Sequence, residues 1–300
     1  MKFIKNHLKF VICMVVIVIL SVYTLTFGIK LALNNEIFTK PKVVTKIYSV
    51  WHIETFEGGG KSRILFLKDI AKNIEKQNIG VLFNIKQISP ENLENELKDN
   101  KPDIFSFGYG VGDKILPYLI NLDNTYSVRD SLIESGSFNA KLYAIPYMVS
   151  GYALLTHSPE SVYTVYGENG YTKASIFNKS ATSINGQYEA YKRFVNNKNY
   201  NLIGTARDVF RVENLNNIGR TNATISALTG YTDLIQYAGI TSCDYIAKLF
   251  IENLVNKENQ LKLTDYFLFS SLHTKLYTNG IYNDMENAIF SAEIPNVFYE

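Results

Sequence analysis

A glycine-rich segment at residues 57–62, with the sequence EGGGKS, contains residue types that bind phosphate. A phosphate-binding loop also requires a glycine at the position that Thr55 occupies here. No strand ending in an aspartate follows the segment to hold magnesium. We therefore interpret the segment as a glycine turn that leads into a helix, whose N-terminus could bind an anion or a sugar hydroxyl.

Histidine and cysteine side chains give no metal-ligand or catalytic pattern. The histidines lie on separate segments, at His7, His52, His157 and His273. None is near another histidine or a cysteine, so we predict no metal site and no cofactor. No GxSxG elbow is present and Cys243 has no base beside it, so no catalytic residue is predicted and we do not expect an enzyme. We expect Cys243 to pack into the core from a helix face.

Aromatic side chains are abundant, with 21 tyrosines, 18 phenylalanines and one tryptophan. Some of them lie beside polar residues at predicted strand ends and chain crossings. Sugar rings present apolar C–H faces and a rim of hydroxyls, which suit aromatic platforms flanked by carboxylate and guanidinium groups. We predict a ligand-binding site formed by Trp51, Tyr109, Tyr147, Arg207, Asp208 and Tyr231. In the alternative interpretation, Arg207 and Asp208 only bond backbone groups, and Trp51 is a buried sheet residue.

Alternating strands and helices position these residues in the first half of the chain. Residues 43–53, 81–88 and 103–107 are rich in β-branched and aromatic side chains and predict strands. Helical periodicity over 64–74, and a helix start at Ser89, separate these strands. The pattern predicts an α/β sheet with right-handed crossovers. Ligands of such sheets bind beyond the carboxyl ends of the strands, here at residues 51–57 and 107–110.

The second half of the chain changes from polar to apolar. Residues 142–156 predict extended structure, and the polar stretch 158–224 contains one helix, at 187–196. We expect Thr241 and Ser242 to cap a later amphipathic helix that buries Tyr245 on its apolar face. This order predicts two lobes. Residues 45–156 form the first part of lobe 1, residues 157–228 form lobe 2, and residues 229–300 return to lobe 1.

The N-terminal residues predict a membrane segment. Residues 10–29 carry no charged side chain, and Lys2, Lys5 and Lys9 precede them. Twenty helical residues rise about 30 Å, enough to cross the hydrocarbon core of a bilayer. The positive-inside rule places the body outside the cell. We predict a single-pass anchor over 1–30 and a tether over 31–44. The alternative is a cleaved signal peptide with a cleavage site at residues 26–28.

Composition and charge exclude several classes of protein. The chain has 300 residues, of which 46% are hydrophobic and 19% charged, which excludes a wholly disordered protein. Four of the 30 basic residues and no acidic residue lie in 1–30, so the rest carries 26 basic against 28 acidic side chains. A slightly acidic body argues against a nucleic-acid-binding protein. Two cysteines exclude a disulfide-stapled scaffold.

Several sequence stretches resemble one family. Residues 47–60 (IYSVWHIETFEGGG), 101–108 (KPDIFSFG) and 143–147 (YAIPY) resemble segments of the extracellular solute-binding proteins of bacterial ABC importers, in particular the carbohydrate-type group. Residues 203–211 (IGTARDVFR) and 230–237 (GYTDLIQY) are similar to segments of a low-GC Gram-positive branch of that group. The resemblance covers about residues 45–300.

The resemblance implies a two-lobed, periplasmic-binding-protein-like (type II) fold that closes on a small polar ligand. The implied ligand is a sugar or oligosaccharide, the implied partners are ABC permease subunits, and the implied location is the cell membrane. Two features depart from the family: lobe 2 is short, and a membrane anchor replaces the lipid-anchoring cysteine. Alternative hypotheses are a membrane-anchored extracellular sensor or interaction protein that keeps the fold without transport and, third, a surface hydrolase.

Overall fold

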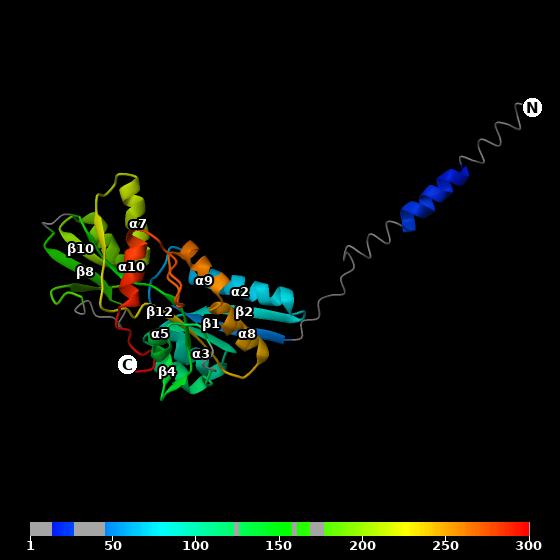
Figure 1. Cartoon of the computed structure of the whole chain (residues 1–300), viewed down its shortest axis with the longest axis horizontal. Helices are drawn as coiled ribbons and strands as arrows, with labels where there is room; N and C mark the ends of the chain where they lie inside the picture. The colour runs from blue at the N-terminus through cyan, green and yellow to red at the C-terminus, as the bar shows by residue number, and fades with distance from the viewer. Residues whose placement is uncertain (1–13, 27–45, 123–125, 158–160, 169–176, 300) are drawn as a thin grey trace, which may run out of the picture. The chain divides into compact units, whose positions relative to one another are not determined.

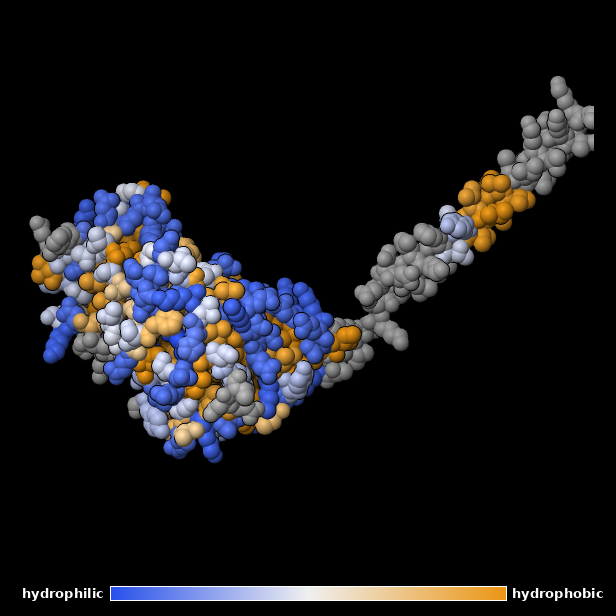
Figure 2. Space-filling model, in the orientation of Figure 1, coloured by the Kyte–Doolittle hydropathy of each residue, from blue (hydrophilic) through white to orange (hydrophobic). Residues whose placement is uncertain are grey.

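The computed structural model describes residues 14–26, 46–122, 126–157, 161–168 and 177–299, and the chain divides into two compact units, residues 1–45 and 46–300. In the first unit, residues 14–26 form a helix whose side chains are all exposed, and its surface is mostly orange in Figure 2. Within the described ranges, no helix combines the length and the apolar character needed to cross a bilayer. The tether predicted at 31–44 lies outside the described residues.

The first sheet contains the three strands predicted near the start of the body. Its order is β2-β1-β3-β12-β6, with β1 (Lys46–Ile53), β2 (Val81–Ile88), β3 (Ile104–Gly108), β6 (Ile145–Val149) and β12 (Ile235–Ile240). Strand β1 pairs in parallel with β2 and β3, and β12 runs antiparallel to β3 and β6. The apolar side chains of β3, β6 and β12 are buried, which explains their nearly continuous hydrophobic sequences.

Three helices lie beside this sheet (Figure 1), namely α2 (Arg63–Gln77), α3 (Leu93–Asp99) and α8 (Tyr245–Leu254). The expected caps of α8 were wrong. The Asp244 carboxylate accepts a 2.8 Å hydrogen bond from the backbone N–H of Ile246, so the helix begins after Thr241 and Ser242. Tyr245 is therefore 71% exposed. Cys243 is also exposed, in the segment before the helix, so the expectation that it packs into the core was wrong.

The second sheet comes from the middle of the chain. Its order is β11-β7-β10-β8-β9, with β7 (Tyr152–Thr156), β8 (Tyr163–Glu168), β9 (Thr182–Asn185), β10 (Tyr200–Thr205) and β11 (Thr224–Ala227). Two helices pack against this sheet. The predicted helix at 187–196 is α6 (Gln187–Asn196), and α7 (Ala206–Asn217) continues directly from β10.

The chain passes between the two sheets several times. It leaves the first sheet between β6 and β7 and returns between β11 and β12. Helix α10 (Gly280–Phe290) then packs against β11. After α10, the Val297 N–H donates a 2.8 Å hydrogen bond to the Ser135 carbonyl at the end of α5 (Asp130–Ser135). The lobe boundaries predicted at residues 156 and 228 stay a prediction.

Short elements complete the body. They are η1 (Pro90–Asn92), α4 (Gly112–Ile115), η2 (Leu116–Tyr118), β4 (Ser137–Phe138), β5 (Lys141–Leu142), α9 (Lys257–Leu261) and η4 (Lys262–Tyr266). The glycine-rich segment forms the predicted turn before α2, and its Gly60 N–H donates a 2.7 Å hydrogen bond to the Tyr266 carbonyl. The turn is thereby fixed against the end of η4.

Candidate ligand-binding cleft

A cleft of about 240 Å³ lies between residues of the two sheets. Its walls come from the segment after β1, the end of β8, the start of α6, the end of β10 and the residue before β12. The lining residues are Glu54, Thr55, Phe56, Glu57, Tyr166, Gly167, Gly186, Gln187, Thr205 and Leu234. Three of these walls are carboxyl ends of strands, which is where ligands bind in open α/β sheets.

A glycine allows the second-sheet wall to form. A Cβ added to Gly167, in β8, would lie 2.0 Å from the Cα of Gln187, so no other residue fits there without a shift of the α6 backbone. The Gln187 side chain accepts a 3.1 Å hydrogen bond from the Gly167 N–H. Its amide group donates to the Ile203 carbonyl at 3.2 Å and to Asp208 Oδ2 at 2.7 Å. Gln187 thus joins β8, β10 and α7 at the cleft.

Asp208 organises the start of α7 behind this wall. It is fully buried, and its Oδ2 accepts a 3.0 Å hydrogen bond from the Thr205 N–H. Its Oδ1 accepts a 3.0 Å hydrogen bond from the Arg211 guanidinium, with which it forms an ion pair. Burial raises the pKa of Asp208, and the hydrogen bonds from Thr205 and Gln187 oppose that rise. The carboxylate therefore ties the helix start to the cleft residue Gln187.

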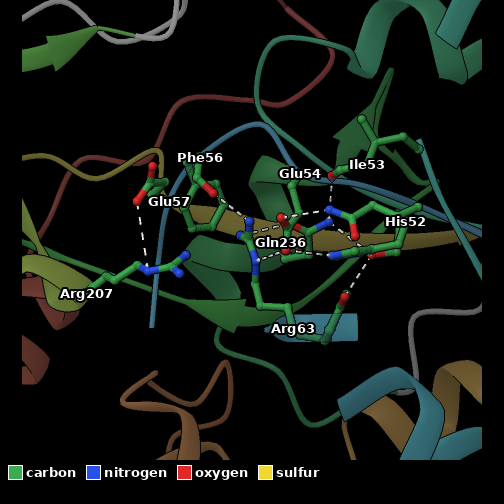
Figure 3. A network of polar contacts seen from close by, with 11 residues as sticks. His52, Ile53, Glu54, Phe56, Glu57, Arg63, Arg207 and Gln236 are labelled. Atoms are coloured by element: carbon green, nitrogen blue, oxygen red, sulfur yellow. Dashed lines mark hydrogen bonds and ion pairs between the residues drawn. The ribbon is translucent and has the colours of Figure 1, made fainter. Parts of the chain in front are cut away.

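A buried arginine supports the first-sheet wall (Figure 3). Arg63, at the start of α2, is 2% exposed. Its Nε lies 3.4 Å from Glu54 Oε1, and its guanidinium also donates to the Phe56 carbonyl. The same guanidinium stacks 4.1 Å from the Phe56 ring centroid. One side chain therefore fixes both the carboxylate and the backbone of the lining segment.

The charge of Glu54 is stabilised although the residue is largely buried. Burial raises its pKa, but a hydrogen bond with His52 and the positive charge of Arg63 outweigh this effect and lower the pKa to about 2. Burial lowers the pKa values of His52 and Arg63. At neutral pH the cleft wall therefore presents an ionised carboxylate that is already oriented by its neighbours.

A chain of hydrogen bonds continues from Glu54 into the first sheet. The His52 Nε2 lies 3.3 Å from Glu54 Oε1, and its Nδ1 lies 2.8 Å from Ser106 Oγ. Gln236 Nε2 donates to Ser106 Oγ at 3.0 Å and to the Ile53 carbonyl at 3.1 Å. This satisfied buried network holds the end of β1 in one conformation.

Glu57 connects the two sides of the cleft. Its Oε2 lies 3.3 Å from Arg211 and 3.9 Å from Arg207 Nε. Both arginines belong to α7, whereas Glu57 follows β1. Figure 3 shows Arg207 extending toward Glu57.

None of the six residues predicted from the sequence is among those that line this cleft. Trp51 is 5% exposed and packs edge-on against Phe105 of β3, with ring centroids 5.9 Å apart. Tyr147 is fully buried, and its hydroxyl lies 2.8 Å from Ser106 Oγ. Asp208 is buried behind the wall, as described above. These three side chains pack inside the body, and their role as ligand contacts stays a prediction.

The other three predicted residues are partly exposed. Arg207 pairs with Glu57 at the edge of the cleft. Tyr231 forms an isolated bridge with Glu293 and contacts the Phe177 ring, with centroids 6.2 Å apart. Burial raises the pKa of Tyr231, and the nearby Asp233 and Tyr109 raise it further. The structure thus brings Tyr109 and Tyr231 near each other, and Tyr231 packs against a cluster that includes the lining residues Phe56, Tyr166 and Leu234. Contact of Tyr109 and Tyr231 with a ligand also stays a prediction.

The strand end predicted at residues 51–57 overlaps the cleft lining at residues 54–57, whereas none of the lining residues is among the six predicted ligand contacts. Residues 51–57 were expected at a ligand-binding strand end, and Glu54 and Glu57 are the acidic side chains there. The pattern of Thr205 followed by Asp208 is typical of a helix start and could have placed Thr205 at the cleft. The predicted helix at 187–196 puts Gln187 at a helix start, but its place at the cleft depends on the close approach of Gly167.

The cleft contains the groups that bind hydroxyl-rich molecules. The residues that line it include two with carboxylates, one with an amide and three with hydroxyls, together with the apolar Phe56 and Leu234. Carboxylates and amides accept and donate hydrogen bonds, and the apolar side chains pack against C–H groups. Among the described residues, no group of three histidine, cysteine or acidic side chains could hold a metal ion.

Comparison with known proteins identifies the fold. No family model and no curated protein sequence matches the chain. The GacH receptor of Streptomyces glaucescens, solved unliganded and with acarbose, matches with a TM-score of 0.60 at 11% identity, covering 84% of this chain and 88% of that one. A Listeria monocytogenes ABC substrate-binding protein in complex with cycloalternan matches with a TM-score of 0.55 at 10% identity, with the same coverage.

A third solved structure, named as a two-component system protein that mediates signal transduction, matches with a TM-score of 0.57 at 13% identity, covering 80% of this chain and 92% of that one. In each case the likeness extends over most of both chains. The chain therefore has the two-lobed α/β fold of bacterial solute-binding proteins.

Proposed function

We propose that this protein captures a sugar or oligosaccharide in the cleft between its two lobes and delivers it to an ABC importer. The observation that carries the proposal is the position of the cleft, at the carboxyl ends of strands of two different sheets. Carboxylate, amide and hydroxyl groups there complement sugar hydroxyls. Proteins of the same fold include one solved with acarbose and one with cycloalternan. Binding without chemical conversion is the proposed activity.

The test is calorimetric titration of the full chain with a panel of maltose, linear maltodextrins, cyclic glucans and acarbose. We expect saturable heat with at least one of them. Glu57→Gln should weaken binding of that sugar roughly tenfold or more, because hydrogen bonds to charged groups contribute about 1.5–3 kcal/mol. Glu189→Gln is the matched control, since Glu189 is an exposed residue of α6 that pairs with Lys192 outside the cleft. Absence of heat with every sugar would contradict the proposal.

A second experiment separates import from signalling. Deleting the gene should lower uptake of the sugar that binds if the protein feeds an importer. Unchanged uptake would instead favour a membrane-anchored sensor or interaction protein, a role consistent with the fold shared with a two-component system protein.

We also propose that residues 10–29 anchor the body to the membrane, with the body on the extracellular side. The support is the absence of charge in these residues, the lysines before them and the exposed apolar helix at 14–26. The full chain should stay in the membrane fraction after alkaline carbonate washing. A chain lacking residues 1–30 should not. Release of the full chain by the wash would contradict anchoring.

A further inference from the structure

The ion pairs of Glu57 join the two lobes across the mouth of the cleft. Glu57 belongs to the segment after β1, and its Oε2 receives Arg211 at 3.3 Å and Arg207 at 3.9 Å from α7. The Glu57 side chain is 36% exposed and that of Arg211 is 21% exposed. The two lobes therefore contact each other directly through these side chains.

The Arg211 side chain is held by contacts other than the one with Glu57. Its other guanidinium nitrogen lies 3.0 Å from Oδ1 of the buried Asp208. Its guanidinium also lies 5.1 Å from the ring centroids of Tyr188 and Tyr191 on α6. An isolated exposed ion pair gains little because both side chains must be ordered to form it. Here the arginine is already held by a carboxylate and two rings, so pairing with Glu57 costs less conformational entropy.

The Glu57 side is also fixed. The Arg63 guanidinium donates to the carbonyl of the preceding residue, Phe56, and stacks on its ring. Glu57 is therefore attached to a rigid segment, and Arg211 to a rigid helix. Because the two partners are attached to ordered segments of different lobes, movement of one lobe away from the other breaks the pair.

Helix α7 makes a second contact with the other lobe, which is aromatic rather than ionic. Phe210 packs against Phe267, which follows η4, with ring centroids 4.6 Å apart. Phe267 also lies against Gly60, where an added Cβ would be 2.5 Å from the Phe267 ring. Salt screens the ion pairs of exposed groups but does not weaken apolar packing. The aromatic contact can therefore remain in place while the ion pairs separate.

We propose that Glu57, Arg207 and Arg211 form an electrostatic latch that sets how far the cleft opens when no sugar is bound. This inference rests on the proposed function, because it assigns the control of access to the same cleft. With the latch formed, the lobes stay close and a ligand enters only when the pairs break. High ionic strength, which shortens the screening length to about 3 Å at 1 M, opens the latch.

The test measures the distance between the lobes in the absence of any sugar. In the full chain with Cys13→Ser and Asn196→Cys, spin labels are attached to the exposed native Cys243 and to position 196 at the end of α6. Pulsed electron resonance then gives the label-to-label distance at low salt and at 1 M NaCl. We expect the distances to lengthen with salt. Adding Glu57→Gln should give the long distances already at low salt.

Glu189→Gln is the control, because it removes the same charge from an ion pair within α6. It should keep the salt response of the parent. Equal distances for Glu57→Gln and parent at low salt, or no salt response in the parent, would overturn the latch. Because no sugar is present, that failure leaves the calorimetric test of sugar binding unaffected, and a failure to bind sugars leaves the distances interpretable.

Discussion

The Tyr152 hydroxyl donates a 2.7 Å hydrogen bond to Asp233 Oδ1, and the two residues lie on different chain crossings between the sheets. Tyr152 begins β7, just after the first crossing, and Asp233 precedes β12 on the return. The same hydroxyl lies 3.0 Å from that of Tyr166, which lines the cleft. A polar chain thus runs from the cleft to the point where the two crossings meet.

Asp233 should make stability depend on pH. Burial raises its pKa to about 6, from 3.8, and the Tyr152 hydrogen bond only partly opposes that rise. The native state therefore binds more protons than the unfolded state between these values, and stability falls as pH increases through this window. A rise of about two pKa units corresponds to about 3 kcal/mol.

Urea unfolding of parent and Asp233→Asn between pH 4 and pH 6.5 measures this effect. The free energy of unfolding of the parent should decrease relative to that of the variant as the pH rises, because the amide cannot ionise. Two parallel curves would show that Asp233 does not carry the pH dependence.

Glu54→Gln should destabilise the fold through Arg63. Breaking a fully buried ion pair costs about 3–5 kcal/mol, and we expect about 2 kcal/mol here because the Glu54 side chain is 32% exposed. Because the pKa of Glu54 is lowered in the folded protein, its ionised form stabilises the fold fully at pH values above the ordinary pKa of 4.5. This contribution is lost as the pH falls toward about 2. Denaturant unfolding at pH 7 provides the measurement. Glu96→Gln, which breaks the exposed pair with Lys86, should change little. A similar loss in both variants would argue against a special role of the Arg63 pair.

Asp208→Ala should loosen the start of α7 and the cleft wall together. The substitution removes the acceptor of one hydrogen bond from the Gln187 amide and of one from the Arg211 guanidinium. We expect a loss of about 2–3 kcal/mol in denaturant unfolding, in the range of hydrogen bonds to charged groups. Amide exchange of residues 206–210 should also become faster. Asp69→Ala, at an exposed position of α2, is the control and should leave both measurements unchanged.

Gly167→Ala should be more damaging than an ordinary glycine substitution. The new Cβ would meet backbone atoms of Gln187 at 2.0 Å and 2.4 Å, so α6 must move away from β8. Gly219→Ala is a useful comparison, because Gly219 has a φ of +69 and no atom within 4 Å of an added Cβ. That variant should lose about 1–2 kcal/mol of stability, which is the cost of an alanine in the left-handed conformation. A smaller loss of melting temperature for Gly167→Ala would contradict the close approach.

The early strands could be predicted because local sequence and tertiary environment agree. Strand β2 coincides with the predicted range 81–88, and β1 and β3 overlap theirs. The start of α8 could not be fixed, since Thr241, Ser242 and Asp244 can all cap a helix, and only packing selects Asp244.

The site was harder to predict than the strands. The strand-end rule placed the ligand near residues 51–57, but it does not say which side chains face the other lobe. Trp51 is the most conspicuous residue of that range, and the sheet buries it against Phe105. Arg207 and Arg211 are four positions apart on α7, so both reach Glu57 from one face of the helix. This relationship appears only once the lobes are in contact.

The path of the C-terminal residues has a mechanical consequence. Among the described residues, the chain passes between the two sheets around 149–152 and 228–234, and again on either side of α10, which packs on β11 before Val297 bonds back to α5. Two connections leave a hinge between the lobes flexible, and each further connection restricts the motion of one lobe relative to the other. Closing such a joint immobilises few new degrees of freedom, so less of the binding free energy is lost to ordering the protein.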